Sequence, residues 1–147
     1  KHAYDVQAPE RGQIIVFKSL DDEKFVLIGR IVGISGDEVS FEAGKLFVNG
    51  NPASREPGRT VQVDGESFEE TSETLGSRTY PVWYLQTTNP TTFSATKVAS
   101  DKVFVVGDNR DQAMDSRRYG AIPRANIIGQ AKKIAESDTP GRAGKEL

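Results

Sequence analysis

The stretch that decides the fold of this chain is residues 103–120, which read VFVVGDNRDQAMDSRRYG. Four apolar residues are closed by a glycine, a pattern typical of a buried β-strand that ends in a turn. A charged segment follows, in which Asp108 and Arg110 are two residues apart, as are Asp115 and Arg117. On extended backbone this spacing puts both members of a pair on one face, where they can pair with each other or across strands.

Apolar runs of similar composition recur along the chain between Gly, Asp, Asn and Pro residues. They lie at 14–17, 25–28, 39–41, 46–48 and 82–85. Their shortness and their content of Val, Ile and Phe favour strands, so the predicted fold class is mainly β. Residues 42–45 include a glycine suited to a hairpin turn, and we expect the runs on either side of them to pair. Residues 25–34 should form one long strand beside the strand that ends at Gly107.

Residues 53–100 are more polar than the flanking sequence and are rich in Thr, Ser and Glu. Aromatic residues persist among them, including Tyr80, Trp83 and Phe93. We interpret this region as an inserted β-ribbon with a mobile tip. Trp83 is better explained as a packing residue of that ribbon than as a platform for a ligand.

The end of the chain divides into three short parts. Residues 124–128 predict a helical turn and residues 128–134 a last strand. Residues 135–147 contain Ser, Asp, Thr, Gly, Pro and charged residues with little to bury, which is typical of a flexible tail. The sequence therefore indicates one domain over residues 1–134.

Composition narrows the classes of function. The 147 residues carry a net charge of −2 and contain no cysteine. A nucleic-acid partner is not expected without a basic face, and neither a disulfide nor a thiolate metal site can form. His2 is the one imidazole, and it lies near the chain start, where catalytic and metal-binding residues are rare. We expect no cofactor and no metal.

No apolar run in the sequence is long enough to cross a bilayer. The chain begins with Lys1 instead of Met, which suggests a fragment or a processed chain with an upstream segment that holds an anchor or a signal.

Three segments resemble, in order, the motifs of bacterial signal peptidase I. Residues 11–17 (RGQIIVF) resemble its Arg-Gly-Asp-Ile-Val-Val-Phe strand, and residues 29–37 (GRIVGISGD) resemble Lys-Arg-Val-Ile-Gly-Leu-Pro-Gly-Asp. Residues 44–51 resemble the hairpin that follows, and residues 107–120 resemble Gly-Asp-Asn-Arg-Asp-Asn-Ser-x-Asp-Ser-Arg-x-x-Gly. On these blocks the chain is identified as a member of the family over about residues 1–134. The resemblance implies a signal-peptidase-like antiparallel β-sheet domain, with an insertion similar to the second subdomain of Gram-negative members.

The resemblance also implies a site that has lost its chemistry. The family cuts with a serine nucleophile and a lysine general base, and the lysine position is Gly29 here. A serine that orients the lysine is replaced by Ala113. The family's Ser-Met-x-Pro-Thr nucleophile motif is absent, because the one methionine, Met114, precedes an aspartate.

The charged residues of the motifs remain. Arg30, Asp108, Arg110, Asp115 and Arg117 match residues that brace the active-site wall in the family. An alternative explanation is a surface ion-pair network of small energy. We favour a scaffold role over direct chemistry for these five residues.

Neighbouring cations do not supply a base on this interpretation. A guanidinium such as that of Arg30 does not deprotonate in proteins. Lys24 is the nearest lysine, but side chains alternate along a strand, so residues 24 and 29 face opposite sides unless a bulge intervenes.

The expected protein is therefore the extracytoplasmic domain of a signal-peptidase-like protein on the periplasmic face of the bacterial cytoplasmic membrane. It binds signal peptides or exported preproteins without cutting them, and it attaches to the membrane through a segment upstream of Lys1. One alternative is an active peptidase whose serine lies upstream and whose base is replaced or mutated. Another is a β-rich domain associated with export that uses no peptide cleft.

The alignment makes one geometric prediction. Gly29 should border a groove lined by residues 28–32 and by the turn at 111–115. Gly29 and Ala113 should then lie close together, with a small void where the lysine chain would run.

Overall fold

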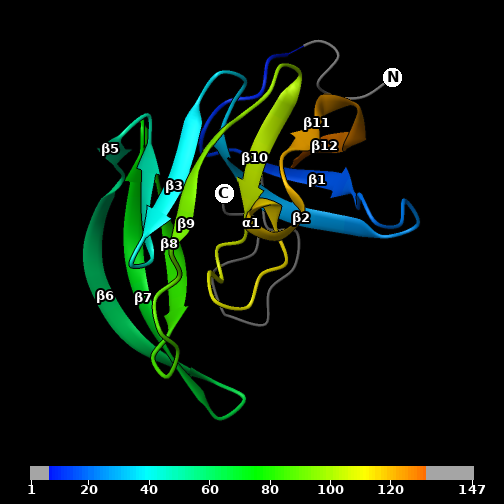
Figure 1. The fold of residues 1–147 in the computed structure, drawn as a ribbon. Helices are drawn as coiled ribbons and strands as arrows, with labels where there is room; N and C mark the ends of the chain where they lie inside the picture. The colour runs from blue at the N-terminus through cyan, green and yellow to red at the C-terminus, as the bar shows by residue number, and fades with distance from the viewer. Residues whose placement is uncertain (1–6, 132–147) are drawn as a thin grey trace.

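A computed structural model describes residues 7–131, which form three antiparallel sheets (Figure 1). The central sheet has the strand order β11-β10-β2-β1-β12. Its strands are β1 (Ile14–Lys18), β2 (Val26–Gly33), β10 (Lys102–Val106), β11 (Ile122–Pro123) and β12 (Ile127–Ala131). The predicted long strand beside the strand ending at Gly107 is confirmed, because β2 pairs antiparallel with β10.

Residues 103–106 of strand β10 are all apolar because both faces of the strand are buried there. Val103 and Val105 belong to a core cluster with β1 and β2, whereas Phe104 and Val106 belong to a second cluster on the other face. The first cluster consists of Ile15, Phe17, Ile31, Val103, Val105, Ile122 and Ile127. A strand buried on both faces needs a continuous apolar run instead of an alternating one, which is what residues 103–106 supply.

The second sheet has the order β5-β4-β3-β9. Its strands are β3 (Glu38–Glu42), β4 (Lys45–Val48), β5 (Asn51–Pro52) and β9 (Phe93–Lys97). The predicted hairpin is confirmed, since Val39 pairs with Val48 and Phe41 with Leu46. The turn residues Ala43 and Gly44 have φ of 48° and 78°, the left-handed conformation that a two-residue hairpin requires.

The insertion forms the third sheet, a ribbon of β6 (Ser54–Val63), β7 (Glu66–Leu75) and β8 (Arg78–Leu85) on the left of Figure 1. Leu75, Tyr80 and Val82 of the ribbon share a core cluster with Phe41 and Val106. The ribbon is therefore packed on the body of the domain. The predicted insertion also includes β9, which pairs with β3 instead of the ribbon.

Trp83 is half-buried in the ribbon. Its ring centroid is 5.4 Å from that of Phe68, and its Nε1 donates a hydrogen bond of 2.7 Å to Glu70. These contacts agree with a packing role.

Two short helical segments follow β10. Helix α1 (Ser116–Tyr119) follows Asp115, whose carboxylate caps it by accepting from the Arg117 N–H, so the spacing argument for extended backbone does not apply to Asp115 and Arg117. The helical turn expected at 124–128 is a 3₁₀ turn, η2 (Arg124–Asn126), and β12 follows it directly. Residues 132–134 of the predicted last strand, the predicted tail and His2 lie outside the described residues.

Candidate functional site

Gly29 lies in the middle of β2, buried between its neighbours. It pairs with Ile15 of β1, and a Cβ atom added to it would lie 2.4 Å from Cγ1 of Val105 and 3.7 Å from Cε1 of Phe17. The predicted void is therefore absent at the place where the first carbon atom of a side chain at position 29 would lie. A valine methyl occupies that volume because Val105 projects from β10 onto the same face as Phe17.

Ala113 reaches the same region through Gly107. A Cβ atom added to Gly107 would lie 2.3 Å from Cβ of Ala113, so the two residues are in direct contact. Gly107 follows Val106, which pairs with Arg30, and the Val106 carbonyl oxygen would lie 3.4 Å from a Cβ atom on Gly29. Positions 29 and 113 therefore each lie against the segment formed by Val106 and Gly107.

An open pocket of about 150 Å³ borders Gly29. It is lined by Ile14, Ile28, Gly29, Arg30, Gly107 and Asp108. These residues come from β1, from β2 and from the segment after β10, so the strand wall of the expected groove is present. The lining residues do not include the turn at 111–115, and among them there is no lysine or serine.

Lys24 is not in the strand. It lies in an exposed turn before β2, where its backbone N–H donates to Asp22. The alternation argument therefore does not apply, and five residues of nearly extended chain would separate the Cα atoms of residues 24 and 29 by roughly 15 Å.

Arg30 is held from three sides. Its Nε and Nη2 donate to the two carboxylate oxygens of Asp108 at 2.9 and 2.8 Å, and its Nη1 donates to the Gly12 carbonyl at 2.7 Å. The guanidinium carbon lies 3.9 Å from the ring centroid of Tyr80, a cation–π contact. With a side chain only 4% exposed, Arg30 is fixed in place.

Arg110 forms a fully buried ion pair with Glu73 of the ribbon. Both side chains are 0% exposed, and Nη2 and Nη1 of Arg110 donate to the Glu73 carboxylate at 2.6 and 2.9 Å. Burial opposes the charge, yet the Glu73 carboxylate raises the pKa of Arg110 above its ordinary value. Burial and the same carboxylate raise the pKa of Tyr80, which stays neutral and donates to Glu73 at 2.8 Å.

Asp115 and Arg117 pair with each other at the start of α1. Arg117 donates from Nε and Nη2 to Asp115 at 2.9 and 2.7 Å. Asp115 also accepts from the backbone N–H of Gly107 at 3.0 Å, and Arg117 donates to the Arg110 carbonyl at 2.7 Å. The pair therefore fixes the course of the segment after β10.

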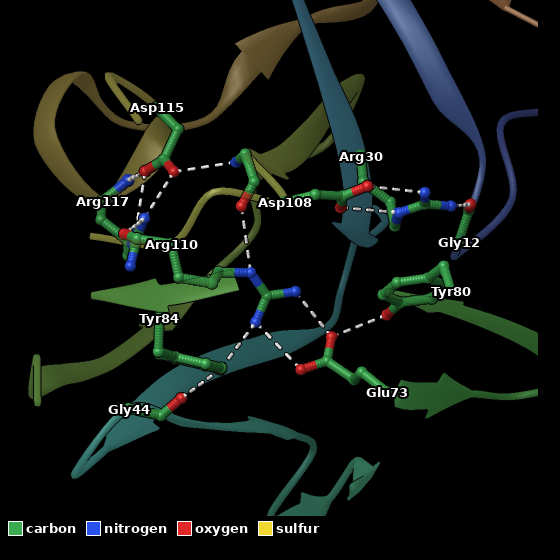
Figure 2. Close-up of polar contacts among 11 residues, drawn as sticks. Gly12, Arg30, Gly44, Glu73, Tyr80, Tyr84, Asp108, Arg110, Asp115 and Arg117 are labelled. Atoms are coloured by element: carbon green, nitrogen blue, oxygen red, sulfur yellow. Dashed lines mark hydrogen bonds and ion pairs between the residues drawn. The ribbon is translucent and has the colours of Figure 1, made fainter. Parts of the chain in front are cut away.

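These contacts close into a ring that includes Gly107, and Figure 2 draws the hydrogen bonds among Arg30, Asp108, Tyr80, Glu73 and Arg110. The ring runs through Gly107, Asp108, Arg30, Tyr80, Glu73 and Arg110, whose Nε donates back to the Gly107 carbonyl at 3.0 Å. The alternative explanation of a surface network is wrong for Arg110, and Asp108 and Arg110 do not pair with each other. Each instead reaches a partner far away in the sequence, which is why spacing alone did not identify the partners.

Glu73 and Tyr80 are the site residues that the sequence pattern did not reveal. Both belong to the insertion, which was interpreted only as a ribbon. A signal was available, because Glu73 is two residues from Leu75 and must share its inward face on a strand.

The described residues offer neither a metal cluster nor a helix that could span a membrane. Among residues 7–131, no group of three or more His, Cys, Asp or Glu residues could hold a metal ion. Within the same residues, no helix is long and apolar enough to cross a membrane.

Comparison with known proteins finds signal peptidases. The profile of the family described as "Signal peptidase, peptidase S26" matches residues 1–135. A probable signal peptidase I-2 of Synechocystis is 29% identical over 136 residues, covering 89% of this chain and 50% of its own length. Signal peptidase I of Rickettsia typhi is 32% identical over 136 residues, covering 86% of this chain and 52% of its own length. The chain thus spans about half the length of these relatives.

A crystal structure of a signal peptidase I from Enterococcus faecalis has the same fold. It aligns with a TM-score of 0.54 at 23% identity, over 85% of this chain and 97% of that one. The predicted fold class is confirmed by this likeness and by the three antiparallel sheets.

Proposed function

Because this chain belongs to the signal peptidase family, peptidase S26, we propose that it binds the signal peptides of exported preproteins without cleaving them. The observation that carries the proposal is Gly29. It stands where the resemblance places the lysine base, and Val105 fills the start of the space that a side chain there would need. Glycine has no group that accepts a proton, and the neighbouring Arg30 is committed to Asp108.

The retained parts of the site support binding. An extended peptide binds to such domains by adding a strand, with small side chains entering shallow pockets, and this needs no lysine. The pocket beside Gly29 is lined by the apolar residues Ile14 and Ile28 and by the ion pair of Arg30 and Asp108, which belongs to the ring that includes Gly107. Asp115 and Arg117 support the same wall.

The family also supports a location for the protein. We propose that the domain lies on the periplasmic face of the bacterial cytoplasmic membrane, anchored by a segment that precedes Lys1. The partner would be a signal peptide or a preprotein emerging from that membrane.

Peptide binding is tested by fluorescence anisotropy with a labelled signal peptide that ends in small residues. Ile28, which is 63% exposed and lines the pocket, is replaced in Ile28→Asp, and Val63→Asp on the ribbon serves as the matched control. We expect saturable binding that Ile28→Asp weakens about tenfold, or ~1.4 kcal/mol, and that the control leaves unchanged. No saturable binding, or equal loss in both variants, would contradict the proposal and favour a domain that uses no peptide cleft.

Cleavage is tested with a purified preprotein. We expect no turnover above the control without protein. Turnover that is abolished by Lys24→Ala and retained in Lys45→Ala would instead establish an active peptidase with a replaced base.

A further inference from the structure

The backbone of Gly29 does not require glycine. The residue lies within strand β2 and is not among the residues with positive φ, so an L-amino acid can adopt its conformation. Some other feature must keep this position free of a side chain.

One contact distinguishes the surroundings of Gly29. An added Cβ atom would have ordinary van der Waals contacts with Phe17 at 3.7 Å and would lie 3.4 Å from the Val106 carbonyl oxygen. Its distance of 2.4 Å to Cγ1 of Val105 is far inside contact range. A single methyl group is therefore the obstruction.

Val105 cannot easily move away. Its side chain is 0% exposed, and it packs in the cluster that contains Phe17, Ile31 and Ile127. Branching at Cβ restricts its rotamers, and its backbone N–H is fixed by a hydrogen bond of 2.9 Å to the buried hydroxyl of Ser116.

We infer that Val105 has taken over the space of a side chain at position 29, so that the core itself maintains the loss of the base. In this packing a side chain at position 29 overlaps Val105 at its first carbon atom, and a smaller residue at 105 would relieve that overlap. The inference rests on the proposed function and extends it, because it explains the absence of a base at position 29 by the packing of Val105. Its test measures unfolding and does not depend on peptide binding.

The test is a double-mutant cycle in the full chain, read by thermal unfolding. Gly29→Ala alone should lower Tm by about 3–10 °C through overpacking. Val105→Ala alone should lower Tm by a similar amount through a cavity. In the Val105→Ala background, Gly29→Ala should lower Tm by less than about 2 °C, because the added methyl enters the vacated space.

Two controls separate this coupling from a general weakening of the core. Gly129→Ala adds a methyl group to β12 where no atom lies within 4 Å, and it should not lower Tm. Val103→Ala removes the same atoms from the same core cluster, and its effect should add to that of Gly29→Ala. If Gly29→Ala lowered Tm equally in the wild-type and Val105→Ala backgrounds, or caused no loss in the wild type, the inference would be overturned.

Methyl NMR provides a second readout if Val105→Ala unfolds too readily. In Gly29→Ala, the Val105 methyl resonances should shift more than those of any other valine. Unchanged Val105 resonances would also overturn the inference.

Discussion

Two ion pairs formed by the same strand differ in almost every physical respect. Glu70 and Glu73 of β7 point to opposite faces, and each binds an arginine. The Arg59–Glu70 pair is 3.3 Å long, with the arginine side chain 76% exposed, whereas the Arg110–Glu73 pair is 2.6 Å long with both side chains 0% exposed. The outer pair, Arg59–Glu70, lies on the solvent-exposed side of the ribbon. The inner pair, Arg110–Glu73, joins the ribbon to the segment beside the candidate site.

The comparison shows how an insertion becomes part of a site. Glu73 accepts from Tyr80 as well as from Arg110, and Tyr80 in turn lies against Arg30. A buried charge that loses its partner is strongly destabilising, whereas an exposed pair contributes little. Four substitutions test how far burial sets the contribution of a charged pair, from the largest expected effect to the smallest.

The largest effect is expected from Glu73→Gln. The substitution keeps the shape of the side chain but leaves the buried Arg110 guanidinium without a counter-charge, so the free energy of unfolding should fall by about 3–5 kcal/mol. Urea denaturation measures the change, with Glu69→Gln on the exposed part of the same strand as control. A loss below about 1 kcal/mol would mean that water reaches the inner pair.

Asp108→Asn should have an intermediate effect. Arg30 would lose a charged bidentate partner, while the Gly12 carbonyl and the Tyr80 ring would still hold it. Because the Asp108 side chain is 34% exposed, we expect a loss of about 1–2 kcal/mol in urea denaturation. A loss as large as that of Glu73→Gln would contradict the ranking of the two pairs by burial.

Asp37, which is not part of the ring, should contribute to the free energy of unfolding in a way that depends on pH. Burial opposes its charge, but hydrogen bonds from Arg11, the Ile34 backbone and Asn49 lower the pKa of Asp37 below its ordinary value. Since the folded pKa is the lower one, the stabilisation is present above the unfolded pKa of about 3.9 and is lost as pH falls through the folded pKa.

The check is the urea midpoint of the wild type and of Asp37→Asn between about pH 2 and pH 6. The difference between the two proteins should shrink as the pH falls below about 4. A difference that stays constant over this range would show that the carboxylate charge is not the cause.

The smallest effect is expected from Arg59→Gln on the outer face. Its pair with Glu70 is long and exposed, so the free energy of unfolding should change by less than about 0.5 kcal/mol. A loss above about 1 kcal/mol in the same urea titration would remove the contrast between the two faces of β7.

Much of the fold was predictable because the relevant signals are local. The run at residues 103–106 indicated a strand, and Gly44 with its neighbours indicated the hairpin between β3 and β4. The segment after Gly107 was less predictable. The i, i+2 spacing of Asp115 and Arg117 did not reveal helix α1, which Asp115 caps because a short polar side chain can satisfy free N–H groups at a helix start.

The candidate site was only partly predictable, because its ion pairs join residues that are far apart in the sequence. Arg30, Asp108 and Arg110 were identified by resemblance, but their partners lie 78 and 37 residues away for the two long-range pairs. Pairing over such distances depends on how the sheets pack. A sequence pattern reports which face a residue occupies and does not report which element will cover that face.

The sequence by itself determined the β class, the family motifs and the absence of a lysine at position 29, because these depend on residue type and local order. The tertiary structure decided that Glu73 of the insertion completes the ring that includes Gly107 and that Val105 fills the space beside Gly29. Both outcomes follow from packing, in which atoms of distant segments compete for the same volume and the same hydrogen bonds.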